Sequence, residues 1–499
     1  MSRQEWCSDK LSKLLHDDSR IPVLHEIKEH LSELPFEEAV QTAKEFELPL
    51  VFDCLNNSNS DQINLACEVL SLCMSKLSLG ESIDRYCVPL ERALNHPNPS
   101  VKLMALMEIH RNALDEEIHC QLCRKQSLLE SVVKCLGDDD LGVVKNASDV
   151  ILLLSSTPTG IRQLTSSEML NAIGKTMSIN EVIKLRFYEV FVHIAAESDG
   201  TQRLLESTGL MSQILTDLEN TDVLLRINVI EILSKLVVTE HGYKYLESQG
   251  VFQKLFQYFN EGSDQLSLQL CEPGILRFFG HMAYWKPTEV LSKYQVPLNR
   301  LFHNLESSDF PLVAVSFDIL GHIGETNEGK VALDTAGDRK VLRAVEIVRE
   351  RLGSLPNEVK LRAMSFLENL FRMKDSDPKI SNLIQKWFNK LGDDGMDFVF
   401  KYVKNPFSEI RLAGLGILNS LCGHHWGQEN IKNTPGLVEF LLDRRVETMK
   451  ECKEATFDII YLLSSSPVFD KITQLRLQAF VKEGPFHVQA ITEVAIEGD

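Results

Sequence analysis

The sequence is short of features that would place the protein in a membrane or an oxidising compartment. No stretch approaches eighteen consecutive apolar residues, so no membrane span is expected. The start, MSRQEWCSDKLSKLL, lacks the apolar core of a signal peptide. The 11 cysteines are scattered and contain a single Cys-x-x-Cys spacing, Cys120 to Cys123, without a second pair, which argues against a disulfide framework and against a zinc ribbon. We therefore expect a cytoplasmic protein, with the nucleus as a second compartment.

Positive charge is also in deficit. The 52 Lys and Arg residues face 71 Asp and Glu residues, which gives a formal net charge of −19. Such a balance disfavours nucleic acid and anionic membranes as partners and favours a basic protein surface. Hydrophobic residues make up 44% of the 499 residues, enough for a large core. The length suits about three globular domains or one long repeat array.

Catalytic signatures are missing as well. The sequence has no Gly-x-Ser-x-Gly, His-Glu-x-x-His or dinucleotide-binding fingerprint. The segment GETNEGK at 324–330 matches a phosphate-binding loop in spacing. However, it follows the helix-like FDILGHI instead of a strand, and Val331 stands where Ser or Thr would hold magnesium. We predict that the protein is not an enzyme and has no catalytic residue, cofactor or metal.

What the sequence does contain is a repeat. Two apolar residues, a glycine and another apolar residue recur with separations of four, six and four positions. Successive copies start about forty residues apart, or about twice that where a copy has decayed. This frame fits Val150, Leu154, Gly160 and Leu164; Val190, Ile194, Gly200 and Leu204; Ile232, Leu236, Gly242 and Leu246; Ile319, Ile323, Gly329 and Leu333; and Ile417, Leu421, Gly427 and Ile431. A degenerate copy begins at Ile109 and Ala113.

The spacing predicts pairs and triplets of helices. The first two positions lie one turn apart on a helix, and the glycine is expected to end that helix in the left-handed conformation. Further helices follow, as in GVFQKLFQYF, and then another helix of the type Val143/Ala147. The predicted fold class is all-α, a HEAT/armadillo-type α-solenoid that forms a right-handed superhelix of helical repeats. We expect a helical cap over 1–43, the solenoid over 44–480 and an extended tail over 481–499.

The segment CGHHWGQ at 422–428 resembles a metal site at first sight. Gly427 is the frame glycine, so the histidines occupy a turn that other copies fill with SSTPT or GETNE. Adjacent histidines on a helix also point about 100° apart, which suits one tetrahedral site poorly. We interpret the segment as a structural turn.

An acidic residue precedes the frame start in most copies. At about 100° per residue this position, the ladder position, points away from the buried stripe, toward the expected inner surface of the solenoid. The acidic ladder consists of Glu108, Asp149, Glu189, Glu231, Asp318 and Asp458, with Gly416 as the exception. One hypothesis is that it steers a basic partner domain. The alternative is that these carboxylates are only solvated, or are neutralised by neighbours such as Arg186 and Arg226.

Several segments carry a family resemblance from about Leu48 to the C-terminus. They are EGPFHVQAITEVAIEGD at the end, PGLVEFLLDRRVE (435–447), VLLRINVIEILSKLVVTEHGYKYLESQGV (223–251) and PGILRFFGHMA (273–283). The sequence resembles the proteasome non-ATPase regulatory subunit 5 family.

That resemblance implies a chaperone for assembly of the 19S regulatory particle base. Members bind the C-terminal domain of an ATPase subunit, regulatory subunit 7, in an intermediate with regulatory subunit 4 and non-ATPase subunit 2, and leave before the particle is complete. We expect a protein that is monomeric by itself. A transport receptor of the armadillo type is an alternative, but only Trp426 and Asn430 have the Trp-x-x-x-Asn spacing of that class. A general protein-interaction scaffold also remains open.

Overall fold

A computed structural model describes residues 2–259, 265–337 and 339–487, with the side chains of 265–268 left aside. Every regular element in these ranges is helical, which confirms the all-α solenoid class. The chain forms two compact units, residues 1–246 and 247–499.

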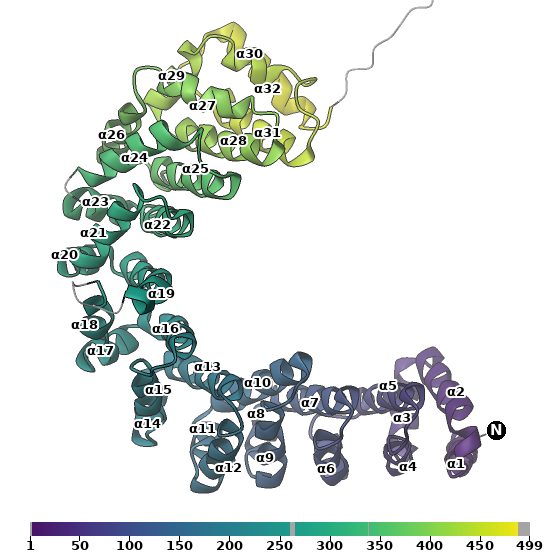
Figure 1. Cartoon of the computed structure of the whole chain (residues 1–499). Helices are drawn as coiled ribbons and strands as arrows, with labels where there is room; N and C mark the ends of the chain where they lie inside the picture. The colour runs from purple at the N-terminus through teal and green to yellow at the C-terminus, as the bar shows by residue number, and fades with distance from the viewer. Residues whose placement is uncertain (1, 260–264, 338, 488–499) are drawn as a thin grey trace, which may run out of the picture. The chain divides into compact units, whose positions relative to one another are not determined.

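Unit 1 consists of short and long helices in alternation (Figure 1). Its elements are α1 (Arg3–Leu14), η1 (Asp17–Ser19), α2 (Arg20–Glu33), α3 (Phe36–Glu45), α4 (Pro49–Asp53), α5 (Ser60–Lys76), α6 (Glu81–Leu94), α7 (Pro99–Ala113), α8 (Glu116–Leu122), α9 (Gln126–Cys135), α10 (Leu141–Ser155), α11 (Pro158–Leu164), α12 (Ser167–Met177), α13 (Glu181–Glu197), α14 (Asp199–Ser207), α15 (Leu210–Asp217) and α16 (Val223–Val237). The boundary between the units falls within α17 (Glu240–Ser248).

Unit 2 repeats the same alternation. Its elements are α18 (Val251–Gln257), α19 (Gln265–Trp285), α20 (Pro287–Lys293), α21 (Gln295–Asn304), α22 (Phe310–Ile323), α23 (Asn327–Ala336), α24 (Lys340–Arg351), α25 (Asn357–Phe371), α26 (Pro378–Phe388), η2 (Asn389–Leu391), α27 (Gly395–Val403), α28 (Ser408–Cys422), α29 (His425–Asn433), α30 (Leu437–Leu442), α31 (Lys450–Ser464) and α32 (Lys471–Glu483). Helices also cover most of 271–300 and 367–385, the two segments in which a copy of the frame has decayed.

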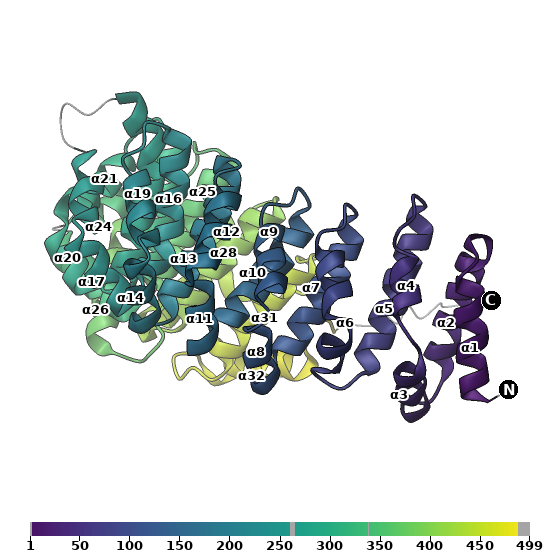
Figure 2. The same ribbon diagram turned by 90° about the horizontal axis from the view of Figure 1, so that it is seen from below.

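The long helices of each unit pack side by side in a row. In unit 1 the row is α2, α5, α7, α10, α13 and α16, and in unit 2 it is α19, α22, α25, α28 and α31. Figure 1 shows α6, α9 and α12 on one side of the row in unit 1, and Figure 2 shows the same helices from below. The stripes predicted from the sequence form the core: Val143, Ala147 and Val150 of α10 are all fully buried. Burial of such stripes against neighbouring repeats is what stabilises a solenoid.

The frame glycines do not end the long helices, and this corrects the sequence-based expectation. They lie in the first turn of the following short helix, and none of them has a positive φ. A Cβ at Gly160, Gly242, Gly329 or Gly427 would overlap the carbonyl oxygen of the residue six positions earlier. Glycine is required there because the short helix starts directly against the end of the long one. Gly200 is different, since a Cβ there would meet only Ser198 Oγ, at 3.7 Å.

The left-handed glycines occur one helix later. Gly209, Gly250 and Gly436 have φ of 80°, 71° and 76° and precede α15, α18 and α30, the further helices that the frame predicted. Arg339 takes the same conformation before α24, with φ of 64°. A residue without Cβ adopts this conformation at least cost.

Two predicted domain boundaries lie at helical residues. Residue 43 falls inside α3, and α32 continues to Glu483, where Gly484 with φ of 85° ends it. Most of the predicted tail, 488–499, lies outside the described residues. The division into cap, solenoid and tail stays a prediction.

Candidate interaction surface

Three members of the acidic ladder are exposed carboxylates: Asp149 on α10, Glu231 on α16 and Asp458 on α31. None of the three makes an ion pair or a side-chain hydrogen bond within the described part of the chain. Each stands on the exposed side of a long helix whose opposite side is core. These three carboxylates are therefore available to a cationic group from outside.

Two further members are exposed but already paired with cations on the next long helix. Lys235 Nζ of α16 lies 2.6 Å from Glu189 Oε1 of α13, and Arg362 of α25 lies 3.5 Å from Asp318 Oδ1 of α22. Partial burial raises the pKa of Asp318 despite that arginine. Lateral neutralisation thus occurs, although Arg186 has no part in it: its Nη1 donates to the carbonyl oxygens of Leu136 and Asp138. Surface pairs of this kind add little stability and can be exchanged for a partner's cation.

Glu108 does not belong to the exposed ladder, and this is a correction. Its side chain is buried, with the residue 5% exposed. Its carboxylate accepts hydrogen bonds from Ser82 Oγ, from Arg111 Nη2 at 2.7 Å and from Asn112 Nδ2 at 2.7 Å. A partner cannot reach a carboxylate enclosed in this way.

The repeat frame in α7 is displaced by one residue relative to α10. Val101 and Ala105 of α7 match Val143 and Ala147 of α10, and the same offset of 42 places Glu108 on the buried position of Val150. One residue turns the side chain by about 100°, from outside to inside. The true ladder position in α7 is Met107, which is 62% exposed.

The same alignment adds two acids to the ladder that the repeat frame does not include. Glu68 precedes Val69 on α5, and Glu26 precedes Ile27 on α2. Both are exposed and paired across helices, Glu68 with Lys28 at 2.7 Å and Glu26 with Lys10. In α5 the spacing of Ala66, Val69 and Cys73 repeats that of Ala147, Val150 and Leu154. This repeated spacing marks the buried stripe and could have indicated Glu68 from the sequence.

The two histidines of CGHHWGQ have structural surroundings. His424 is buried at the start of α29; its Nε2 lies 2.8 Å from the Phe371 carbonyl oxygen and its Nδ1 lies 2.9 Å from Ser381 Oγ. Desolvation lowers the pKa of His424, which favours the neutral ring. His425 is exposed and points to Glu429. Within the described residues no group of three or more His, Cys, Asp or Glu side chains has the arrangement of a metal site.

The lysine of GETNEGK is also structural. Lys330 is fully buried, and its Nζ donates to the carbonyl oxygens of Gly324 and, at 3.0 Å, of Asn369. It therefore ties the end of α22 to the end of α25, two helices of the row. Desolvation lowers its pKa to about 7. A side chain held in this way cannot reach a bound phosphate.

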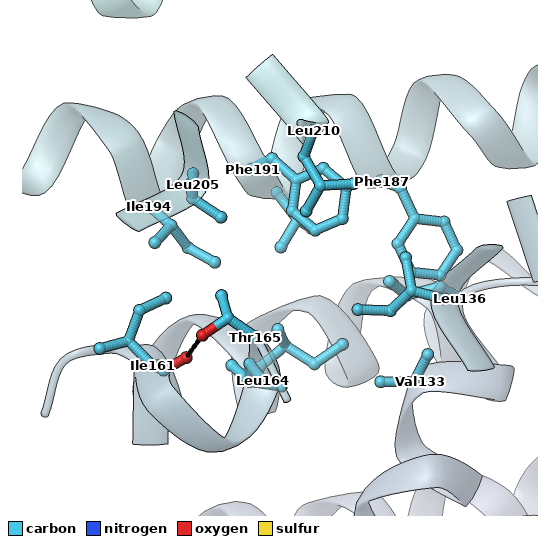
Figure 3. Close-up of a pocket in the computed structure, with 13 residues that line it drawn as sticks. Val133, Leu136, Ile161, Leu164, Thr165, Phe187, Phe191, Ile194, Leu205 and Leu210 are labelled. Atoms are coloured by element: carbon cyan, nitrogen blue, oxygen red, sulfur yellow. Dashed lines mark hydrogen bonds between the residues drawn. The ribbon is translucent and has the colours of Figure 1, made fainter. Parts of the chain in front are cut away.

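An apolar cavity lies in the core of unit 1 and is lined by residues from α9 to α15 (Figure 3). Its wall includes Ile161, Phe187, Phe191 and Leu205, and its one hydroxyl, on Thr165, donates to the Ile161 carbonyl oxygen at 2.8 Å. The free space of about 10 Å³ is at the lower limit for one water molecule. This cavity is a packing gap and has no room for a ligand.

No helix in the described ranges is both long and apolar enough to cross a lipid bilayer. The candidate sites that the geometry supports best are the exposed sides of the long helices in each unit, with the unpaired carboxylates of Asp149 and Glu231 in unit 1 and of Asp458 in unit 2.

Comparison with known proteins agrees with the resemblance seen in the sequence. The profile of the family described as "Proteasome non-ATPase 26S subunit" matches residues 3–499. The 26S proteasome non-ATPase regulatory subunit 5 of Bos taurus is 28% identical over 97% of this chain and 98% of its own length. The proteins of the same name from Homo sapiens, at 27%, and Drosophila melanogaster, at 24%, cover 94% and 90% of this chain and 94% and 89% of their own lengths. The chain belongs to the proteasome non-ATPase 26S subunit family.

Proposed function

We propose that this protein is a chaperone for assembly of the 19S regulatory particle base of the 26S proteasome. It binds the C-terminal domain of a base ATPase subunit, regulatory subunit 7, through its long-helix rows and leaves before the particle is complete. Regulatory subunit 4 and non-ATPase subunit 2 belong to the same intermediate. The work is done by binding alone, without catalysis or a cofactor, in the cytoplasm and nucleus.

The observation that carries this proposal is the family match along the whole chain, joined to a row of exposed carboxylates. A helical repeat array offers a long surface on which a folded domain can be held and its other contacts blocked. Unpaired acids such as Asp149 and Glu231 favour a basic domain and speed its encounter. Polar contacts also permit release when the finished complex competes for the same domain.

An armadillo-type transport receptor is less consistent with the structure. Trp426 and Asn430, the pair with the appropriate spacing, lie on the short helix α29 and not on a long helix of the row. Trp426 Nε1 donates to Ser381 Oγ at 3.2 Å, and its ring lies against that of His424. A general scaffold with another partner remains the second candidate, because exposed acids do not select one basic domain by themselves.

Native pull-down of the full chain from cell extract, with identification of co-purifying proteins, tests the assignment. We expect base ATPase subunits and non-ATPase subunit 2, and no 20S core subunits. Recovery of complete 26S particles, or of no base subunit, would contradict a role in an assembly intermediate. Recovery of import cargoes would favour the transport alternative.

A further inference from the structure

The ladder is interrupted on α28, and the interruption leaves a groove. Gly416 takes the ladder position there, and together α25, α28 and α31 surround an open space of about 380 Å³. A Cβ at Gly416 would lie 2.6 Å from Glu368 Oε2 of α25, so the carboxylate of Glu368 occupies the place a side chain would take. All three helices belong to unit 2.

The groove is mostly apolar with carboxylates at its edge. It is lined by Leu361, Glu368, Glu409, Leu412, Ala413, Leu415, Gly416, Asn419, Ala455 and Asp458. No lysine or arginine is among these residues. Arg372, directly after the end of α25, pairs with Glu368, whereas Glu409 and Asp458 have no cation within the described structure.

The exposed carboxylates set the polar character of the groove. Asn419 also lines it, but its Oδ1 is buried and out of a ligand's reach. Glu409 and Asp458, by contrast, are exposed to solvent. A side chain that fits this groove needs a long apolar stem, because leucine and alanine line the walls. It also needs a cationic end with several hydrogen-bond donors, because carboxylates lie at the edge.

We propose that this groove receives an arginine side chain from a basic segment of the partner domain. The stem packs on Leu412, Ala413 and Ala455, and the guanidinium pairs with Asp458 and Glu409. A guanidinium has five donors in a fixed plane, so it can pair with two carboxylates at once. The inference rests on the proposed function, in that the segment belongs to the ATPase domain bound by the rows.

The test uses the full chain and two capped nonapeptides in which arginine or its uncharged analogue citrulline alternates with glycine. We expect the arginine peptide to bind at least tenfold more tightly than the citrulline peptide. Asp458→Asn combined with Glu409→Gln should weaken its binding about tenfold. Glu439→Gln, at an exposed acid on α30 outside the groove, is the matched control and should leave binding unchanged.

A second variant separates shape from charge. Ala455→Leu fills the groove without changing any charge and should also weaken the arginine peptide about tenfold, with an unfolding temperature close to that of the unchanged protein. If that variant does not fold, the two neutralising substitutions, both at exposed positions, still decide the matter. Equal binding of the arginine and citrulline peptides, or equal loss in Glu439→Gln, would overturn the proposal.

The ATPase domain itself distinguishes the two proposals. If regulatory subunit 7 binds the unchanged chain and the Asp458→Asn/Glu409→Gln variant equally, the groove assignment is wrong and the proposed function stands. If the ATPase domain binds neither protein, while the arginine peptide still binds the unchanged chain more tightly than the variant, the proposed function is wrong and the groove remains an arginine site.

Discussion

The two units use the same helices to build different surfaces. In unit 1 an acid stands at the ladder position of α2, α5, α10, α13 and α16, and only α7 departs from this with Met107. In unit 2, Asp318 and Asp458 are separated by Ser365 and Gly416. Charge is thus spread along the row of unit 1 and gathered around a groove in unit 2. Under the proposed function, the exposed acids of unit 1 would act on a basic domain at long range, and the groove of unit 2 would make a specific contact.

Both units should share one kind of turn between the long helix and the following short helix. Substitution of the frame glycines tests this, and it is expected to have the largest effect on stability. Gly329→Ala in unit 2 and Gly160→Ala in unit 1 should each destabilise the protein by about 3 kcal/mol, because the Cβ overlaps a backbone oxygen that cannot move freely. Urea unfolding measures the loss. Gly200→Ala, where there is open space, is the control and should change stability by less than about 1 kcal/mol in the favourable direction. Equal effects at Gly200 and Gly329 would contradict the close-approach explanation.

The assignment of Glu108 to the core of α7, which makes this helix the exception in unit 1, can be tested by substitution. Glu108→Ala should lower the free energy of unfolding by about 2–3 kcal/mol, because Ser82, Arg111 and Asn112 lose a buried acceptor. Asp149→Ala, at an exposed position, should change it by less than about 0.5 kcal/mol. Both values come from the same urea titration. A stable Glu108→Ala protein with weakened partner binding would return Glu108 to the exposed ladder.

A pH dependence specific to unit 2 follows from Lys330. Its pKa of about 7 in the folded chain lies below the ordinary value of 10.5, so the unfolded chain binds more protons between these two values. Stability therefore rises with pH from about 7 to about 10, by at most ~1.4 kcal/mol per pH unit, and is flat below 7 as far as this group is concerned. The Lys330→Met variant should lack this rise in urea unfolding at pH 6 to 9. An identical pH profile in the two proteins would show that Lys330 keeps its proton in the core.

The smallest effect concerns the spread charge of unit 1. Asp149→Lys combined with Glu231→Lys should weaken binding of the ATPase domain about tenfold and reduce its salt dependence, with little change in stability. Glu189→Lys, where Lys235 already neutralises the acid, should have a smaller effect. Titration calorimetry at two salt concentrations measures both. Unchanged affinity and unchanged salt dependence would remove the ladder as a binding surface.

The sequence predicted the repeats well because each copy buries the same stripe. Val150, Leu154 and their counterparts recur at fixed spacing, and that spacing alone indicates stacked long helices. The spacing predicted the position of the frame glycine correctly, but the expected reason, a left-handed conformation, was wrong. Spacing cannot distinguish a glycine required by its φ from one required by a neighbouring carbonyl oxygen, since both follow the end of a helix.

The site was harder to predict because it depends on the register of single helices. In α7 both Glu108 and Ile109 fit a helical stripe next to Ala105, and apolar character alone selected Ile109 as the frame start. The groove at Gly416 could not be foreseen either, because an interruption of the ladder becomes a groove only when the side chains of two neighbouring helices leave the space open. Glu368 and Asp458 are separated by 90 positions and line the same groove only in the folded unit.

The most direct measurement is a titration of the full chain with the isolated C-terminal domain of regulatory subunit 7 at about 50 and 300 mM salt. We expect a 1:1 complex whose dissociation constant increases at least tenfold at the higher salt concentration, as expected for contacts made largely by exposed carboxylates. Absence of a complex at the lower salt concentration, or an affinity that does not depend on salt, would contradict it.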